Sequence, residues 1–189
     1  MPHLEISPGW VMLMAVLYYV NPMGCFWPFC AAAAIHELGH LAAAFLLHIP
    51  LCGLRLDAGG AVLAAGTTDY RRELVCALAG PAFNLLTLLF HRRFPMLAAL
   101  SLLLAVFNLL PVPPLDGGRA LRALLLLHCS EARARTILLR TSAVTAAVLC
   151  GFVLWAAAFR GCGIWPVLAA ALTVWRISVS FRREEKNPL

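Results

Sequence analysis

The chain has 189 residues, of which 62% are hydrophobic and 13% charged, and its mean hydropathy is +0.84. Soluble proteins have about 45–50% apolar and about 25% charged residues, so this composition excludes a soluble protein and predicts an integral membrane protein. The net charge of +6 does not indicate nucleic-acid binding, because no nucleic-acid motif accompanies it.

Apolar segments follow one another along the whole chain, and each is near the ~20 residues that cross a bilayer. We expect no cleaved signal peptide, because no basic residue precedes the first segment. Short runs around Gly59-Gly60 predict a small β-hairpin after the second segment. We therefore expect an all-α integral membrane protein with about six transmembrane helices. The segments are Gly9–Trp27, Pro28–Leu47, Leu74–Phe90, Pro95–Pro114, Ile137–Phe159 and Gly163–Phe181.

The basic residues gather on one side of this arrangement. With about six spans, both termini and the loops after the second and fourth segments share a side. All the Lys and Arg residues fall there except Arg92, Arg93 and Arg160. Cytoplasmic loops carry such an excess of basic residues, so the bias predicts that both termini are cytoplasmic. It also explains the basic net charge without any nucleic acid.

Three ionisable residues interrupt the second segment, in the stretch "AAAAIHELGHLAAAFLL". A charge at bilayer depth costs roughly 2.5–3.5 kcal/mol on insertion scales, so ionisable residues there indicate a functional site. His36 and His40 are four residues apart, and on a helix both imidazoles can reach one metal ion. Glu37 lies beside them in the His-Glu-x-x-His pattern of zinc hydrolases, where the glutamate is a general base.

A catalytic zinc ion usually has a third protein ligand, and Asp116 is a candidate for it. It follows the proline-interrupted end of the fourth segment, in "NLLPVPPLDGGRAL". Prolines remove backbone hydrogen bonds, so we expect this end to be unwound, which is tolerated at membrane depth only in protein or at a cavity. The position equally fits an aspartate that caps the following helix.

These motifs together resemble the site-2 protease family of intramembrane zinc metalloproteases. The pattern Asn-x-x-Pro-x-x-Pro-x-Asp-Gly after "HELGH" is matched by Asn108, Pro111, Pro114, Asp116 and Gly117. "AGPAFN", at residues 79–84, is similar to the Gly-Pro-x-x-Asn element of the family's intervening helix. The layout looks most like the compact branch that includes the sporulation protease processing a pro-sigma factor.

The resemblance implies a role for each matched residue. His36, His40 and Asp116 correspond to the ligands of one Zn²⁺ per chain, and Glu37 to the catalytic acid/base. Asn108 resembles a residue that holds substrate or stabilises the oxyanion. Asn84 either lines the site or is an amide that packs helices. Pro111 and Pro114 are further candidates for substrate binding or transition-state stabilisation, and their stretch would form the wall of a water channel. The expected hairpin corresponds to the family's membrane-associated strands.

The implied function is cleavage of a transmembrane or membrane-tethered protein by zinc-activated water with Glu37 as general base. Substrates of this kind include a tethered transcription or sigma factor and a remnant signal peptide, in a bacterial cell membrane with membrane regulatory proteins as further partners. The alternatives are a membrane zinc transporter and an inactive scaffold homologue. A transporter has no need of Glu37 beside a ligand.

We expect one polytopic protease domain over residues 1–189. Its catalytic core would span about residues 28–120, and residues 137–181 would hold two further spans. Neither a PDZ domain nor a C-terminal nucleotide-binding domain is expected.

Overall fold

A computed structural model describes residues 3–6, 18–19, 24–49, 51–57, 60–65 and 69–160. The chain divides into two compact units, Met1–Leu109 and Leu110–Leu189. The predicted sixth apolar segment lies wholly outside the described residues, and so does most of the first. The single domain and the total of six spans therefore stay predictions.

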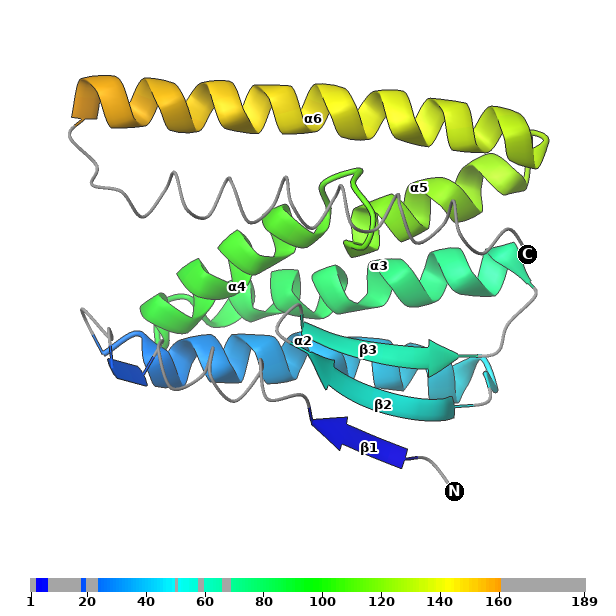
Figure 1. The fold of residues 1–189 in the computed structure, drawn as a ribbon. Coiled ribbons are helices and arrows are strands. Elements are labelled where there is room, and N and C mark those ends of the chain that lie inside the picture. The colour runs from blue at the N-terminus through cyan, green and yellow to red at the C-terminus, as the bar shows by residue number, and fades with distance from the viewer. Residues whose placement is uncertain are drawn as a thin grey trace. The chain divides into compact units, whose positions relative to one another are not determined.

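Three helices form the body of the first unit. They are α2 (Phe26–Leu46), α3 (Tyr70–Leu86) and α4 (Pro95–Asn108), and each packs against the other two (Figure 1). The short 3₁₀ helix η1 (Thr87–Phe90) continues α3. Alanines supply much of the buried apolar surface, and such small residues let membrane helices approach closely.

Glycine sets the approach of α2 and α3. A Cβ atom on Gly39 would lie 2.6 Å from the carbonyl oxygen of Ala79 and 2.9 Å from Cα of Gly80. These separations are shorter than a van der Waals contact, so a larger residue at position 39 would force the helices apart. The glycine of "HELGH" therefore serves the packing of the helix that carries the histidines.

A three-stranded sheet completes the first unit. Strand β2 (Leu51–Asp57) pairs antiparallel with β3 (Gly60–Ala65) and parallel with β1 (His3–Ile6), in the order β1-β2-β3. Gly59 of the predicted turn lies outside the described residues. The association of this segment with the membrane stays a prediction, and the sequence did not indicate the pairing of β1.

The second unit contains α5 (Asp116–Leu126) and α6 (Glu131–Arg160), which contact each other. The backbone from 109 to 115 is not helical, which confirms the predicted interruption by "PVPP". Ser142 of α6 donates a hydrogen bond of 3.2 Å to the carbonyl oxygen of Pro111. This bond satisfies a backbone acceptor that the interrupted helix leaves without its usual partner.

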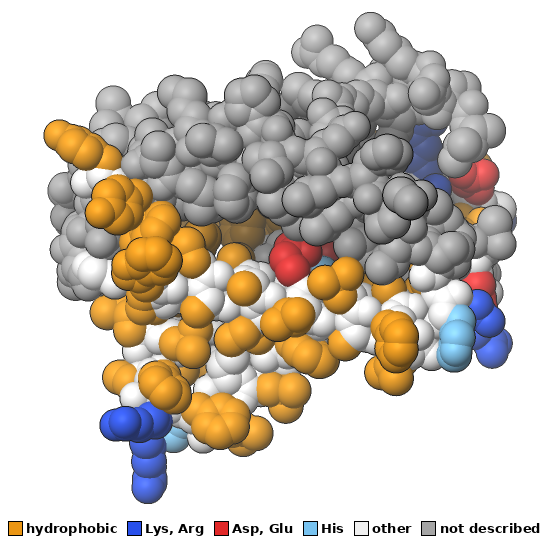
Figure 2. Space-filling model, turned by 90° about the horizontal axis from the view of Figure 1, so that it is seen from below, with side chains coloured by type: hydrophobic (Ala, Val, Ile, Leu, Met, Phe, Trp, Pro, Cys, Tyr) orange, Lys and Arg blue, Asp and Glu red, His pale blue; other side chains and the backbone are white. Residues whose placement is uncertain are grey.

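Three described helical stretches are long and apolar enough to cross a membrane: Phe26–Leu46, Tyr70–Phe90 and Glu131–Phe152. The fourth predicted segment is shorter than expected, because α4 has 14 residues and ends at Asn108. Large hydrophobic side chains on these helices are exposed, and Figure 2 shows mostly hydrophobic side chains among those coloured. Such surfaces suit lipid, and the described part of the chain has the character of a membrane protein.

Candidate metal centre

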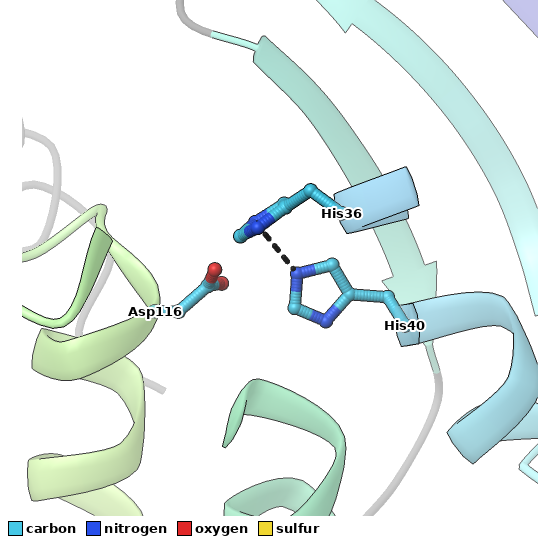
Figure 3. Close-up of side chains that lie close together, drawn as sticks. All are labelled: His36, His40 and Asp116. Carbon is cyan, nitrogen blue, oxygen red and sulfur yellow. Dashed lines mark hydrogen bonds between the residues drawn. The ribbon is translucent and has the colours of Figure 1, made fainter. Parts of the chain in front are cut away.

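Helix α2 presents two buried histidines on one face. His36 and His40 are 5% and 6% exposed, and their rings meet edge to face with centroids 4.8 Å apart. Their Nε2 atoms are 3.2 Å apart and point toward each other (Figure 3). Positions four apart on a helix lie one above the other, so the spacing read from the sequence produces this pair. The contact brings two potential ligand atoms to one point.

Helix α3 supplies a hydrogen-bond partner for the Nδ1 atom of each ring. Nδ1 of His40 is 2.8 Å from the carbonyl oxygen of Cys76, and Nδ1 of His36 is 3.1 Å from Nδ2 of Asn84. A carbonyl oxygen only accepts, so Nδ1 of His40 carries the proton and its Nε2 has a lone pair. An acceptor such as the Cys76 carbonyl oxygen fixes the ring orientation and tautomer of a metal-binding histidine.

Gly80 of α3 provides the space for the two rings. A Cβ atom at this position would collide with Nε2 of His40 and lie 2.9 Å from Cε1 of His36. Any other residue would therefore push into the imidazoles. In the sequence, Gly80 was noted only as part of the "AGPAFN" motif. The structure explains why this position is a glycine, because the imidazole rings occupy the space of a side chain. The role of the Cys76 carbonyl left no signal in the sequence, because a backbone acceptor does not depend on the side chain.

Glu37 follows His36 on α2 and is partly buried. Successive residues on a helix are about 100° apart, so its carboxylate leaves the helix beside the histidine face. This placement suits a group that acts near a metal ion without being one of its ligands.

Asp116 is the first residue of α5, in the second unit, and is 7% exposed. Its Oδ1 lies 3.7 Å from an Nη atom of Arg119, one helical turn further on. That ion pair is long, and the arginine side chain is 35% exposed, so it compensates the buried carboxylate only weakly. Gly118 lets the loop approach the start of α5, because a Cβ atom there would collide with the backbone of Val112 and Pro113.

The remaining predicted residues have varied environments. Asn84 is fully buried, whereas Asn108 at the end of α4 is partly buried and donates 3.0 Å to the carbonyl oxygen of Leu104. Pro111 is partly buried and Pro114 is exposed. Of these residues, only Asn84 has a hydrogen bond to a histidine of the pair among the described contacts.

Comparison with known proteins finds similarity to one peptidase family and to proteins with zinc metalloprotease names. Residues 88–149 match the model of peptidase family M50. Rip3 of Mycobacterium tuberculosis, which bears a provisional zinc metalloprotease name, is 32% identical over 191 residues, covering 90% of this chain and 48% of that protein. Part of this chain is therefore similar to peptidase family M50, and most of the chain is similar to a protein with a zinc metalloprotease name.

Two proteins of Methanocaldococcus jannaschii are also similar to this chain. The zinc metalloprotease MJ0392 of Methanocaldococcus jannaschii is 29% identical over 143 residues, covering 65% of the chain and 42% of that protein. The solved site-2 protease from the same organism has the same fold, with a TM-score of 0.65 at 23% identity. That match covers 89% of this chain and 85% of the solved one. The chain spans about half the length of the curated relatives it matches.

Proposed function

We propose that this chain is an intramembrane zinc metalloendopeptidase. The observation that carries the proposal is the buried histidine pair of α2, whose Nε2 atoms face each other at 3.2 Å while each Nδ1 has a partner on α3. Burying two imidazoles in an apolar helix is unfavourable, so ionisable residues at such positions indicate a functional site. The zinc metalloprotease names of the relatives support the same reading.

The donor groups of the chain suit zinc. His36, His40 and Asp116 offer two imidazole nitrogens and a carboxylate, and all three are buried. Zinc in hydrolases takes three protein ligands of these types and keeps a fourth position open. We propose that these residues bind one ion per chain. The space that Gly80 leaves around the rings supports the assignment.

The chain's own residues supply the proton transfers. Bound zinc would polarise the scissile carbonyl group and an attacking water molecule. Glu37 takes a proton from that water and returns it to the leaving amine, which breaks the peptide bond without a covalent enzyme intermediate. Asn108 stabilises the oxyanion or holds the substrate backbone, and Pro111 and Pro114 form the wall through which water enters.

The substrate must present an extended backbone, because a helix shields its carbonyl groups through hydrogen bonding. Strand β3 stands at the end of the described order β1-β2-β3, so one of its edges pairs with no described strand. An extended segment can add to such an edge through main-chain hydrogen bonds. We propose that a transmembrane or membrane-tethered protein binds there before cleavage, for example a tethered transcription factor or a remnant signal peptide.

The distribution of basic residues over the whole sequence favours one orientation in the membrane, although one described span has arginines at both ends. Arg71 and Arg72 lie at the start of α3, and Arg92 and Arg93 lie in the turn after η1, so basic pairs flank this candidate span. The excess of Lys and Arg on one side of the six predicted spans supports both termini in the cytoplasm. We propose that the membrane is a bacterial cell membrane. Positions near both ends of a span also suit arginine, whose long side chain reaches the interface.

The test is Glu37→Gln in the full chain, with cleavage followed by comparing the membrane proteomes of producing cells. Glutamine keeps the shape but cannot accept the proton, so we expect precursors to accumulate and cleavage to fall by about 10²–10⁴-fold. Zinc content should not change. The matched control is Glu73→Gln on α3, also partly buried, which should cleave like the wild type. Full cleavage by the Glu37 variant would remove the proposed base.

A further inference from the structure

Asn84 is a buried amide devoted to one histidine. It is 0% exposed, its Nδ2 lies 3.1 Å from Nδ1 of His36, and its Oδ1 has no hydrogen-bond partner in the described part of the chain. An unsatisfied buried carbonyl oxygen costs about 1–3 kcal/mol. A fully buried side chain with this cost is poorly suited to bind substrate, so the amide has another use.

The orientation of this amide fixes the tautomer of His36. With Nδ2 as donor, Nδ1 of His36 accepts, and the neutral ring carries its proton on Nε2. That Nε2–H then donates across 3.2 Å to the lone pair on Nε2 of His40. A protonated Nε2 cannot bind a metal ion, so this tautomer of His36 is not the one that a ligand needs.

Rotation of the amide by about 180° exchanges its oxygen and nitrogen with little change in shape. Oδ1 would then occupy the position 3.1 Å from Nδ1 of His36 and accept its proton. Nε2 of His36 would gain a lone pair, as Nε2 of His40 already has through Cys76. Both rings would then present ligand atoms to the same point.

We propose that Asn84 is the positioning residue of His36 and rotates between donor and acceptor as metal leaves or enters. A neutral amide suits this role because it holds the ring in both states, whereas a carboxylate would hold only the metal-binding tautomer. The inference rests on the proposed zinc function. In this proposal Asn84 acts by setting the tautomer of His36 and does not contact the substrate.

The first test measures zinc affinity by chelator competition on the full chain in detergent. Asn84→Leu removes donor and acceptor, and we expect the affinity to fall by about 10–100-fold, as for other partners of metal-binding histidines. Asn84→Asp keeps an acceptor and should bind zinc at least as tightly as the wild type. Ser101→Ala is the matched control, since Ser101 is also 0% exposed with an unpartnered buried oxygen in the described structure. Wild-type affinity in Asn84→Leu would overturn the proposal.

The second test records the histidine tautomers by ¹⁵N NMR of the metal-free chain, with His36 signals identified by their loss in His36→Gln. The wild type should carry the His36 proton on Nε2, and Asn84→Asp should move it to Nδ1. An unchanged tautomer in Asn84→Asp would overturn the proposal even if Asn84→Leu fails to fold. A wild-type chain that binds no zinc would refute the zinc function instead, and the NMR comparison would still report on Asn84.

Discussion

Helices α2 and α6 are both candidate membrane spans, yet the histidines of α2 and the threonines of α6 find their hydrogen-bond partners in different ways. In α6, the hydroxyl groups of Thr136, Thr141 and Thr145 each donate to a carbonyl oxygen four residues earlier in the same helix. In α2, His36 and His40 have partners on α3. Polar side chains that form hydrogen bonds within their own helix need no partner on a second helix and do not indicate a functional site.

The difference explains which polar residues of an apolar chain carry function. A threonine that bonds its own helix can face lipid or protein with little penalty, and much of α6 is exposed. The histidines of α2 are acceptable only because α3 supplies a carbonyl, an amide and the empty space of Gly80. Such dependence on a second helix indicates groups that are held for chemistry.

The largest expected effect comes from making α2 resemble α6. His40→Leu removes one proposed ligand and leaves an apolar helix, so zinc affinity should fall by more than about 100-fold, because a ligand matters more than its hydrogen-bond partner. Helical content should be retained. Thr145→Val on α6 is the control and should leave zinc binding unchanged. Chelator competition and circular dichroism make the comparison; wild-type zinc affinity in His40→Leu would refute the ligand assignment.

Two aspartates at the starts of helices allow the same comparison between a locally bonded side chain and a proposed metal ligand. Asp69 caps α3 locally, accepting 2.9 Å from the backbone N–H of Arg71 and pairing with Arg72 at 3.4 Å, and it is exposed. Asparagine is an equally good cap, so Asp69→Asn should change little. Asp116→Asn should weaken zinc retention by about 10–100-fold, because a neutral amide is a poorer ligand. Equal zinc content in both purified variants would exclude Asp116.

Alanine substitutions of two helical glycines should give the smallest effects, and these change the stability in opposite directions. Gly80→Ala should destabilise the chain by about 1–3 kcal/mol, because its Cβ would collide with the histidine rings. A Cβ on Gly151 of α6 meets nothing within 4 Å, so Gly151→Ala should stabilise by about 0.5–1 kcal/mol through helix propensity. Thermal unfolding in detergent measures both. Stabilisation of both variants would show that Gly80 does not cradle the rings.

Sequence patterns predicted the apolar helices better than their ends. The third segment was expected from Leu74, but α3 begins at Tyr70 because Asp69 caps it and Arg71 supplies the bonded N–H. The last described span was expected from Ile137, yet α6 begins at Glu131, since its polar first turns are also good helix formers. Hydropathy shows which residues are apolar, and these helices begin in polar residues before the apolar segment.

The candidate site was predicted in part. The spacing of His36 and His40 follows from helix geometry and produces the observed pair. Their partners could not be predicted, because periodicity does not say which face of α3 meets α2, and a backbone carbonyl such as that of Cys76 has no residue signature. For Asn84 the sequence offered lining or packing, and its full burial beside His36 instead supports a positioning role.

The measurement that tests the account most directly is the metal content and X-ray absorption spectrum of the purified full chain. The account predicts one zinc ion per chain with two imidazole nitrogens at about 2.0–2.1 Å and oxygen in the remaining positions. The imidazole signal should disappear in a variant lacking both His36 and His40. A chain that retains no zinc, or zinc without imidazole ligands, would contradict the assignment of the α2 histidines to a catalytic metal centre.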